Sequence, residues 1–235
     1  MSGATGSSTI EAHLALGIHI SGLRFAYKRG FSLSIPSLHI AAGEQVLLAG
    51  SSGSGKSTLL HLIAGLENPD AGSIQIRGTD ICALHGARRD TFRGKNIGMI
   101  FQTFNLLQGF TAIENVMMAL MLAGYSTSDQ RSRADSALRR LNISDVNAPV
   151  ENLSVGQQQR VAVARAMAGE PCIVLADEPT ASLDPANAVG AINIIKDAAR
   201  ATGAALIVTS HDPSLREAFS RIEEISDLCK AEVQR

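Results

Sequence analysis

The sequence predicts an α/β fold built on a mainly parallel sheet. Three short runs, Q-V-L-L-A at 45–49, C-I-V-L-A at 172–176 and A-L-I-V-T-S at 205–210, are almost uniformly apolar, as in central strands that are covered on both faces. Two of these runs are followed by helical segments, at 56–65 and at 185–202, and the second has a proline in its first turn. Such alternation of strand and helix is typical of parallel sheets.

Less uniform β-rich runs lie at 18–25, 73–77 and 96–101. For the sheet as a whole we expect mainly parallel strands, with antiparallel strands at its edges. Between about 103 and 155 the chain has no β-rich run, and D-Q-R-S-R-A-D-S-A-L-R-R-L at 129–141 is typical of a charged amphipathic helix. The sequence therefore predicts a helical lobe inserted into the α/β core.

This division makes residues 18–235 a single domain that carries the lobe at about 103–155. Residues 1–17 contain no Lys or Arg, which is poor for a signal peptide and predicts a disordered terminus instead. The alternative is a separate C-terminal domain that begins near 150. The apolar strand at 172–176 argues against it, because that strand is needed in the same sheet as the earlier ones.

The composition restricts the class of protein. With 45% hydrophobic and 18% charged residues among 235, the chain can bury a sizeable core. Its net charge of −1 gives no sign of a nucleic-acid partner. The scattered cysteines Cys82, Cys172 and Cys229 match no metal-binding spacing and suit a reducing compartment. The longest apolar stretch, near Val116–Gly124, is about half as long as a membrane-spanning helix, so we expect the chain not to span a membrane by itself.

A phosphate loop is predicted at G-S-S-G-S-G-K-S-T, residues 50–58, which fits the pattern G-x-x-x-x-G-K-[ST]. It follows an apolar strand and opens an apolar helix, which is the context that this motif needs. Its glycines let successive N–H groups point at the phosphates, while Lys56 is placed to reach the β- and γ-phosphates and Ser57 to bind Mg²⁺. The predicted nucleotide-binding residues of the loop are Gly50, Ser51, Ser52, Gly53, Ser54, Gly55, Lys56, Ser57 and Thr58.

Two carboxylates end the apolar run I-V-L-A-D-E. A carboxylate at the carboxyl end of a buried strand faces the crevice in which α/β sheets bind ligands. We therefore expect Asp177 to hold Mg²⁺ and Glu178 to act as the general base on the water that attacks the γ-phosphate. A merely solvated strand end is the alternative interpretation of this pair.

With L-S-V-G-Q-Q-Q-R at 153–160 placed before the strand that ends in Asp-Glu, the chain resembles the ATP-binding subunit of ABC transporters. The resemblance covers about residues 18 to 213 and implies a P-loop NTPase core that uses ATP and Mg²⁺. It identifies L-S-V-G-Q with the family signature, in which Ser154, Gly156 and Gln157 face a partner's ATP. Ser154 is also placed to cap its helix.

Further residues match other motifs of the family. Gln102 in I-F-Q-T-F resembles the Q-loop glutamine that reaches the metal or the attacking water, and Asp184 in A-S-L-D the D-loop aspartate. His211 in T-S-H-D resembles the switch histidine that bonds the γ-phosphate. Tyr27 in F-A-Y-K-R lies where the family stacks an aromatic ring on adenine, although a sheet-edge aromatic residue is the alternative for it.

The resemblance also implies partners. Two subunits of the family bind head to tail, and each ATP lies between the phosphate loop of one and the signature of the other, so the second phosphate site serves the partner's nucleotide. We expect a second copy of the chain and an integral membrane permease as partners. The implied location is cytoplasmic, at the inner face of the cell membrane. The stretch F-Q-T-F-N-L-L-Q-G-F-T-A-I-E-N-V and the short length are similar to the subgroup that serves lipoprotein release, macrolide-type export and cell division.

Two alternatives share these motifs. One is a soluble ATPase that remodels a protein or a cluster-assembly scaffold. The other is a DNA-repair or chromosome protein, which would need long coiled-coil arms, and no heptad run is present.

The chain departs from the family in two places. Val155 stands where the family commonly has Gly, and R-I-E-E-I-S-D-L at 221–228 lacks the apolar strand and Asp-Gly turn that usually follow the switch histidine. The segment after the Q-loop is unusually apolar for a loop, with Phe104, Leu106, Leu107 and Phe110. These side chains are either part of the core or an exposed patch that needs a partner.

Overall fold

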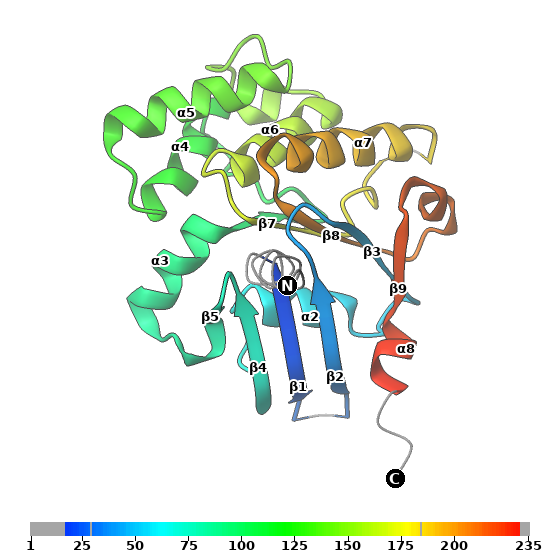
Figure 1. Ribbon diagram of the computed structural model, residues 1–235. Helices are drawn as coiled ribbons and strands as arrows, with labels where there is room; N and C mark the ends of the chain where they lie inside the picture. The colour runs from blue at the N-terminus through cyan, green and yellow to red at the C-terminus, as the bar shows by residue number, and fades with distance from the viewer. Residues whose placement is uncertain (1–16, 29, 184, 231–235) are drawn as a thin grey trace, which may run out of the picture.

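The computed structural model of the chain describes residues 17–28, 30–183 and 185–230, and it contains two sheets (Figure 1). The larger sheet has the order β6-β7-β8-β3-β9 and is parallel throughout. Its strands are β3 (Gln45–Ala49), β6 (Ile97–Ile100), β7 (Ile173–Asp177), β8 (Ala205–Ser210) and β9 (Arg221–Glu224). The predicted terminus, residues 1–17, lies outside the described residues apart from Gly17.

The smaller sheet is antiparallel and has the order β2-β1-β4-β5. It comprises β1 (Ile18–Ala26), β2 (Ser32–Ile40), β4 (Ala71–Ile76) and β5 (Thr79–Asp80). The predicted α/β fold is thus confirmed, and the antiparallel strands form a sheet of their own rather than the edges of the parallel one. The sequence pattern did not reveal β2, because Pro36 interrupts it. The strand tolerates the proline since β2 is an edge strand.

Helix α2 (Lys56–Ile63) lies between the two sheets (Figure 1). The strands of the parallel sheet alternate between two apolar clusters. In β3, Val46 and Leu48 belong to the cluster around α2, whereas Leu47 and Ala49 belong to the cluster under α6 (Val155–Met167) and α7 (Pro185–Thr202). Both faces of the sheet are buried there, which explains why β3, β7 and β8 are almost uniformly apolar.

The helical lobe consists of α4 (Ala112–Leu122), α5 (Thr127–Arg140) and one face of α6. Helix α6 belongs to both parts of the molecule: Val161 packs in the lobe, while Val163 and Met167 pack under the parallel sheet. In the described ranges, none of the helices combines the length and apolar character required to cross a bilayer. The remaining elements are α3 (Gly86–Asn96), α8 (Ile225–Lys230) and the 3-10 turns η1 (Ile81–Ala83), η2 (Val150–Asn152) and η3 (Pro213–Ala218).

The C-terminal edge forms a strand although its sequence is charged. Strand β9, R-I-E-E, pairs in parallel with β3. Arg221 forms two ion pairs, from Nη1 to Glu44 Oε1 (2.9 Å) and from Nη2 to Glu223 Oε1 (2.7 Å). In place of the apolar strand that the resemblance implies, the chain thus has a short strand in which ion pairs accompany the backbone ladder.

Candidate active site

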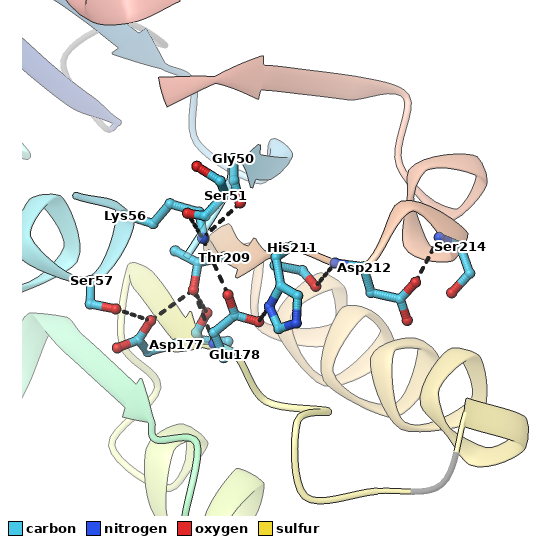
Figure 2. A network of polar contacts seen from close by, with 12 residues as sticks. Gly50, Ser51, Lys56, Ser57, Asp177, Glu178, Thr209, His211, Asp212 and Ser214 are labelled. Atoms are coloured by element: carbon cyan, nitrogen blue, oxygen red, sulfur yellow. Dashed lines mark hydrogen bonds and ion pairs between the residues drawn. The ribbon is translucent and has the colours of Figure 1, made fainter. Parts of the chain in front are cut away.

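The carboxyl ends of β3, β7 and β8 meet beside the start of α2 and bring Lys56, Glu178 and His211 together (Figure 2). Lys56 is buried, with 5% of its surface exposed. Its Nζ donates hydrogen bonds to the carbonyl oxygens of Gly50 (2.9 Å) and Ser51 (3.0 Å) and lies 3.3 Å from Glu178 Oε1. The lysine is therefore fixed at the centre of the phosphate loop.

The phosphate loop is shaped to receive an anion. Gly55 is the N-cap of α2, at φ 101°, and a Cβ at this position would lie 2.5 Å from Phe31 Cζ. No side chain caps the helix, so its first N–H groups are free to bind phosphate. Ser54 Oγ is buried and has no hydrogen-bond partner within the described part of the chain, as expected of a loop whose polar groups serve a ligand.

Asp177 ends β7 and receives two hydrogen bonds on the same oxygen. Ser57 Oγ and Thr209 Oγ1 each donate to Oδ1 at 2.8 Å. A carboxylate and a hydroxyl are hard oxygen donors that suit Mg²⁺, which takes most of its remaining ligands from water and phosphate. The described residues contain no group of three or more His, Cys, Asp or Glu side chains that could hold a metal by themselves. The site therefore fits Mg²⁺ bound together with a nucleotide.

Glu178 is held in an unusual backbone conformation. Its φ of 45° lies in the left-handed region that non-glycine residues seldom adopt, and such strain clusters at functional sites. Its N–H donates to Thr209 Oγ1 (3.0 Å), and its Oε2 lies 3.0 Å from His211 Nδ1. The carboxylate is thus oriented by Lys56 on one oxygen and by His211 on the other.

Thr209 is the site residue that the motifs did not identify. It is fully buried and pairs with Asp177 in the register of β7 and β8. Its hydroxyl joins both carboxylate-bearing residues, because it donates to Asp177 and accepts from the backbone of Glu178. The available signal was a polar residue at the end of an otherwise apolar run.

The signature lies at the exposed start of α6. Ser154 is the N-cap: its Oγ accepts from Gln157 N (3.3 Å), and Gln157 Oε1 accepts from Ser154 N (2.9 Å), which completes a capping box. Within the described ranges, no hydrogen bond or ion pair joins Ser154, Gly156 or Gln157 to the phosphate loop of the same chain. Val155 is 51% exposed, so its side chain adds an apolar group to this surface.

Within the described part of the chain, no hydrogen bond joins the predicted residue Gln102 to the carboxylates of Asp177 and Glu178. Gln102 is exposed and accepts a hydrogen bond from Ser182 Oγ through its backbone carbonyl (3.1 Å). The resemblance predicts a role for its side-chain amide instead, at the metal or the attacking water. Asp184 lies outside the described residues.

Tyr27 belongs to an aromatic group beside the phosphate loop. It is 43% exposed, makes an edge contact with Phe25 (ring centroids 4.7 Å apart) and lies 6.1 Å from Phe31. Phe31 packs against Gly55, so the group contacts the loop itself. Sequence reasoning missed Phe31. The exposed tyrosine ring offers a surface for a planar ligand.

The apolar segment after the Q-loop is partly core and partly surface. Phe104 is buried and Leu106 packs against the lobe cluster, whereas Leu107 and Phe110 are each 41% exposed. A groove of about 480 Å³ separates α3 and β6 from α4, and its lining includes Leu66, Met99 and Leu122. Leu66 and Leu122 are exposed.

The chain is similar in sequence and in structure to ATP-binding proteins of one family. Residues 33–181 match the family model described as ABC transporter. The chain is 37% identical to the lipoprotein-releasing system ATP-binding protein LolD of Paramagnetospirillum magneticum over 92% of its length and 98% of the relative's. It is 38% identical to the macrolide export ATP-binding/permease protein MacB of Syntrophobacter fumaroxidans, covering 89% of this chain but 30% of that relative. The dimeric post-hydrolysis structure of the ATP-binding cassette MJ0796 with ADP and Pi aligns with a TM-score of 0.75 and 34% identity, over 87% of this chain and 92% of the other.

Proposed function

The chain belongs to the ABC transporter family, as an ATP-binding and ATP-hydrolysing subunit, and we propose that it hydrolyses Mg-ATP in a sandwich of two copies docked on a membrane permease. The observation that carries this proposal is the convergence of Lys56, Asp177, Glu178 and His211 on one phosphate loop (Figure 2).

Each side chain has a distinct task in the proposed reaction. Lys56 binds the β- and γ-phosphates and neutralises charge that develops on them. Glu178 accepts the proton of the attacking water, and His211, 3.0 Å from its Oε2, orients that carboxylate and bonds the γ-phosphate. Mg²⁺, held by Ser57 and Asp177 with Gln102 as a further ligand, would supply charge stabilisation to the transferred phosphoryl group.

The separation of the two phosphate sites supports a dimer. Ser154, Gly156 and Gln157 are exposed at a helix N-terminus, and helix N-termini bind anions. Within the described residues, no hydrogen bond or ion pair joins them to the phosphate loop of the same chain. In a two-fold arrangement this surface of one copy covers the phosphate loop of the other, and both contacts form together. The relative MJ0796 is dimeric with its hydrolysis products, which supports the same assembly here.

The membrane partner is proposed to sit on the exposed apolar side chains. Leu107 and Phe110 are each 41% exposed in the loop that follows the Q-loop, and exposed apolar side chains of this kind are what a partner would cover. The proteins LolD and MacB are named for lipoprotein release and macrolide export, and we place this chain in the same kind of machine. Its position would then be peripheral, at the inner face of the cell membrane.

A cross-link across the nucleotide tests the sandwich. Cys82, Cys172 and Cys229 are replaced, cysteines are placed at Ser51 and Ser154, which are both exposed, and Glu178→Gln is added to retain ATP. A disulfide needs Cα atoms within about 7 Å, so a short bis-thiol linker is used in parallel. We expect the band on a non-reducing gel to double in mass with ATP present and to stay single without nucleotide.

A control, a contradicting outcome and a further variant complete this experiment. A single-cysteine version at position 154 measures random association. A cross-link that forms within one chain would mean that both phosphate sites face the same nucleotide, which contradicts the sandwich. The same protein with Val155→Gly should cross-link similarly, because Gly156 still offers its N–H to the γ-phosphate.

A further inference from the structure

The segment that displays Leu107 and Phe110, residues 104–110, is a loop whose shape is imposed by side chains from two helices. We call it the docking segment. Arg165 of α6 donates from Nη1 to the carbonyl oxygen of Asn105 (2.5 Å) and from Nη2 to that of Phe104 (2.6 Å). One guanidinium therefore donates hydrogen bonds to the carbonyl oxygens of two consecutive residues.

Those two peptide groups belong to a disfavoured conformation. Phe104 has φ 58° and Asn105 has φ 48°, and two consecutive left-handed residues without glycine are rare. A charged donor makes hydrogen bonds about twice as strong as a neutral one. Burial lowers the pKa of Arg165, and among the described residues its guanidinium donates to these two carbonyl oxygens. The arginine thus makes two charged hydrogen bonds to a turn of disfavoured backbone conformation.

Asn115 of α4 fixes the next part of the segment. It is 1% exposed, and its Oδ1 accepts from Leu107 N (2.7 Å) while its Nδ2 donates to Leu107 O (3.2 Å) and to Thr111 O (3.0 Å). The amide side chain therefore pairs with both backbone groups of Leu107, as a neighbouring strand would. The Leu107 side chain remains 41% exposed beyond it.

We propose that Arg165 and Asn115 are positioning residues that hold the docking segment in the shape in which it meets the membrane partner, an assignment that rests on the docking proposed above. A preformed surface binds with a smaller loss of conformational freedom than a loop that must be ordered. Because Ser154 caps the start of the same helix, α6, Arg165 connects the docking segment to a helix whose other end is proposed to face the partner's nucleotide. Movement of the signature then carries the docking segment with it.

The chain contains no tryptophan, so Phe110→Trp introduces a single fluorophore into the docking segment. Time-resolved anisotropy of Trp emission in the purified chain measures how freely this position moves. We expect Arg165→Met and Asn115→Leu each to increase the amplitude of fast motion at least twofold. Arg165→Lys, which keeps a charged donor, should restore part of the restraint. The matched control is Arg139→Met, since Arg139 is an exposed lobe arginine that pairs with Asp135.

Amide hydrogen exchange on the unsubstituted chain provides a measurement that does not depend on the variants' folding. The N–H of Leu107 should be protected, whereas the exposed N–H of Gly109 should exchange at the rate of an open loop. Rapid exchange at Leu107, or Trp anisotropy that is the same in folded Arg165→Met, Asn115→Leu and Arg139→Met, would overturn the assignment.

Copurification of the membrane protein from detergent-solubilised cells separates this inference from the proposed function. If the unsubstituted chain retains no permease, the docking proposal fails whatever the anisotropy shows. If it retains one that Arg165→Met and Asn115→Leu lose, the positioning role extends to the complex. If the loosened variants keep the permease with the same apparent affinity, the shape of the docking segment is not what the partner recognises, and the inference fails.

Discussion

Glu178 concentrates several properties at one residue: a left-handed backbone, a lysine on one carboxylate oxygen and a histidine near the other. We expect Glu178→Gln to retain ATP binding and to slow hydrolysis by at least ~100-fold, because the proposed general base is lost while little binding energy changes. Phosphate release and nucleotide affinity measure the two effects. Glu217→Gln, at an exposed carboxylate of η3, is the control, and near-normal turnover in Glu178→Gln would remove this residue from the role.

Lys56 gives the complementary result. Lys56→Ala removes the charge that we propose to face the β- and γ-phosphates, so we expect ATP affinity to fall at least ~10-fold. Equilibrium binding of a fluorescent ATP analogue measures it. Unchanged affinity would contradict the assignment of the phosphate loop.

Thr209 tests whether a buried hydroxyl organises both carboxylates. Thr209→Val keeps the shape but leaves the N–H of Glu178 without its acceptor, which costs about 1–3 kcal/mol of unfolding free energy. We expect the concentration of Mg²⁺ that supports half-maximal hydrolysis to rise several-fold, whereas Thr209→Ser should restore it. Equal Mg²⁺ dependence in the two variants would mean that the hydroxyl only serves stability.

The motif residues were predictable because each motif is local in sequence. Lys56 and Ser57 follow from one loop between a strand and a helix, and Asp177 and Glu178 from one strand end. Thr209 and Phe31 were not predictable in the same way. Thr209 acquires its role only from the pairing of β7 with β8, and Phe31 only from the packing of the antiparallel sheet against Gly55.

At the scale of elements, α6 combines a cap with a proposed ligand site. Ser154→Ala removes the capping oxygen and should lower the free energy of unfolding by ~1 kcal/mol. We also expect this variant to lose ATP-dependent dimerisation. Ser154→Asp keeps a capping oxygen, yet it places a negative charge where the partner's phosphates should lie. We expect it to remain stable and to lose the dimer. Chemical denaturation and sedimentation with ATP separate the two effects, and a dimer that survives in Ser154→Asp would exclude this end of α6 from the interface.

Strand β9 should make the sheet edge sensitive to acid. Burial raises the pKa of Glu44, but the Ala41 N–H and Arg221 outweigh burial and hold this pKa below its usual value of about 4.3. Ionised Glu44 therefore stabilises the fold above the pKa that it has in the unfolded chain, and this contribution is lost as pH falls through the lower folded value. Glu44→Gln should be destabilising at pH 7 and nearly neutral at about pH 3. Urea unfolding checks this, with Glu151→Gln as an exposed control.

The bounds of several elements could be predicted, and others could not. The ranges expected for β3, β8 and α7 agree with the structure, because uniform apolar runs and a proline in the first helical turn are strong signals. Helix α3, G-A-R-R-D-T-F-R-G-K-N, contains no fully buried residue, so it offers no apolar periodicity to detect.

For the whole molecule, the division into two sheets depends on pairings between distant segments. Strand β1 pairs with β4 across some fifty residues, and no local pattern specifies that these strands leave the parallel sheet. The helical lobe was easier to infer, since a long stretch without β-rich runs is visible in the sequence itself.

The docking proposal is tested at this scale by Leu107→Asp and Phe110→Asp. Both side chains are 41% exposed, so a charge there should cost little stability while it opposes burial against a partner. We expect copurification of the permease and its stimulation of ATPase activity to be lost, with basal hydrolysis retained. Phe104→Asp serves as a contrast because Phe104 is buried and its replacement should impair folding. Unaltered copurification in both surface variants would place the partner elsewhere.

The charges of β9 also bear on how the protein behaves in concentrated solution. An edge strand of a parallel sheet presents unpaired backbone groups on which another chain can continue the sheet. Here any added strand would have to approach Arg221, Glu223 and Glu224, whose charges are matched within the molecule, and would have to strip water from them. Substituting Arg221 and Glu223 by valine should therefore accelerate aggregation on mild heating, seen as light scattering, even where catalysis is intact. The ion pairs of β9 thus disfavour the addition of a strand from another molecule.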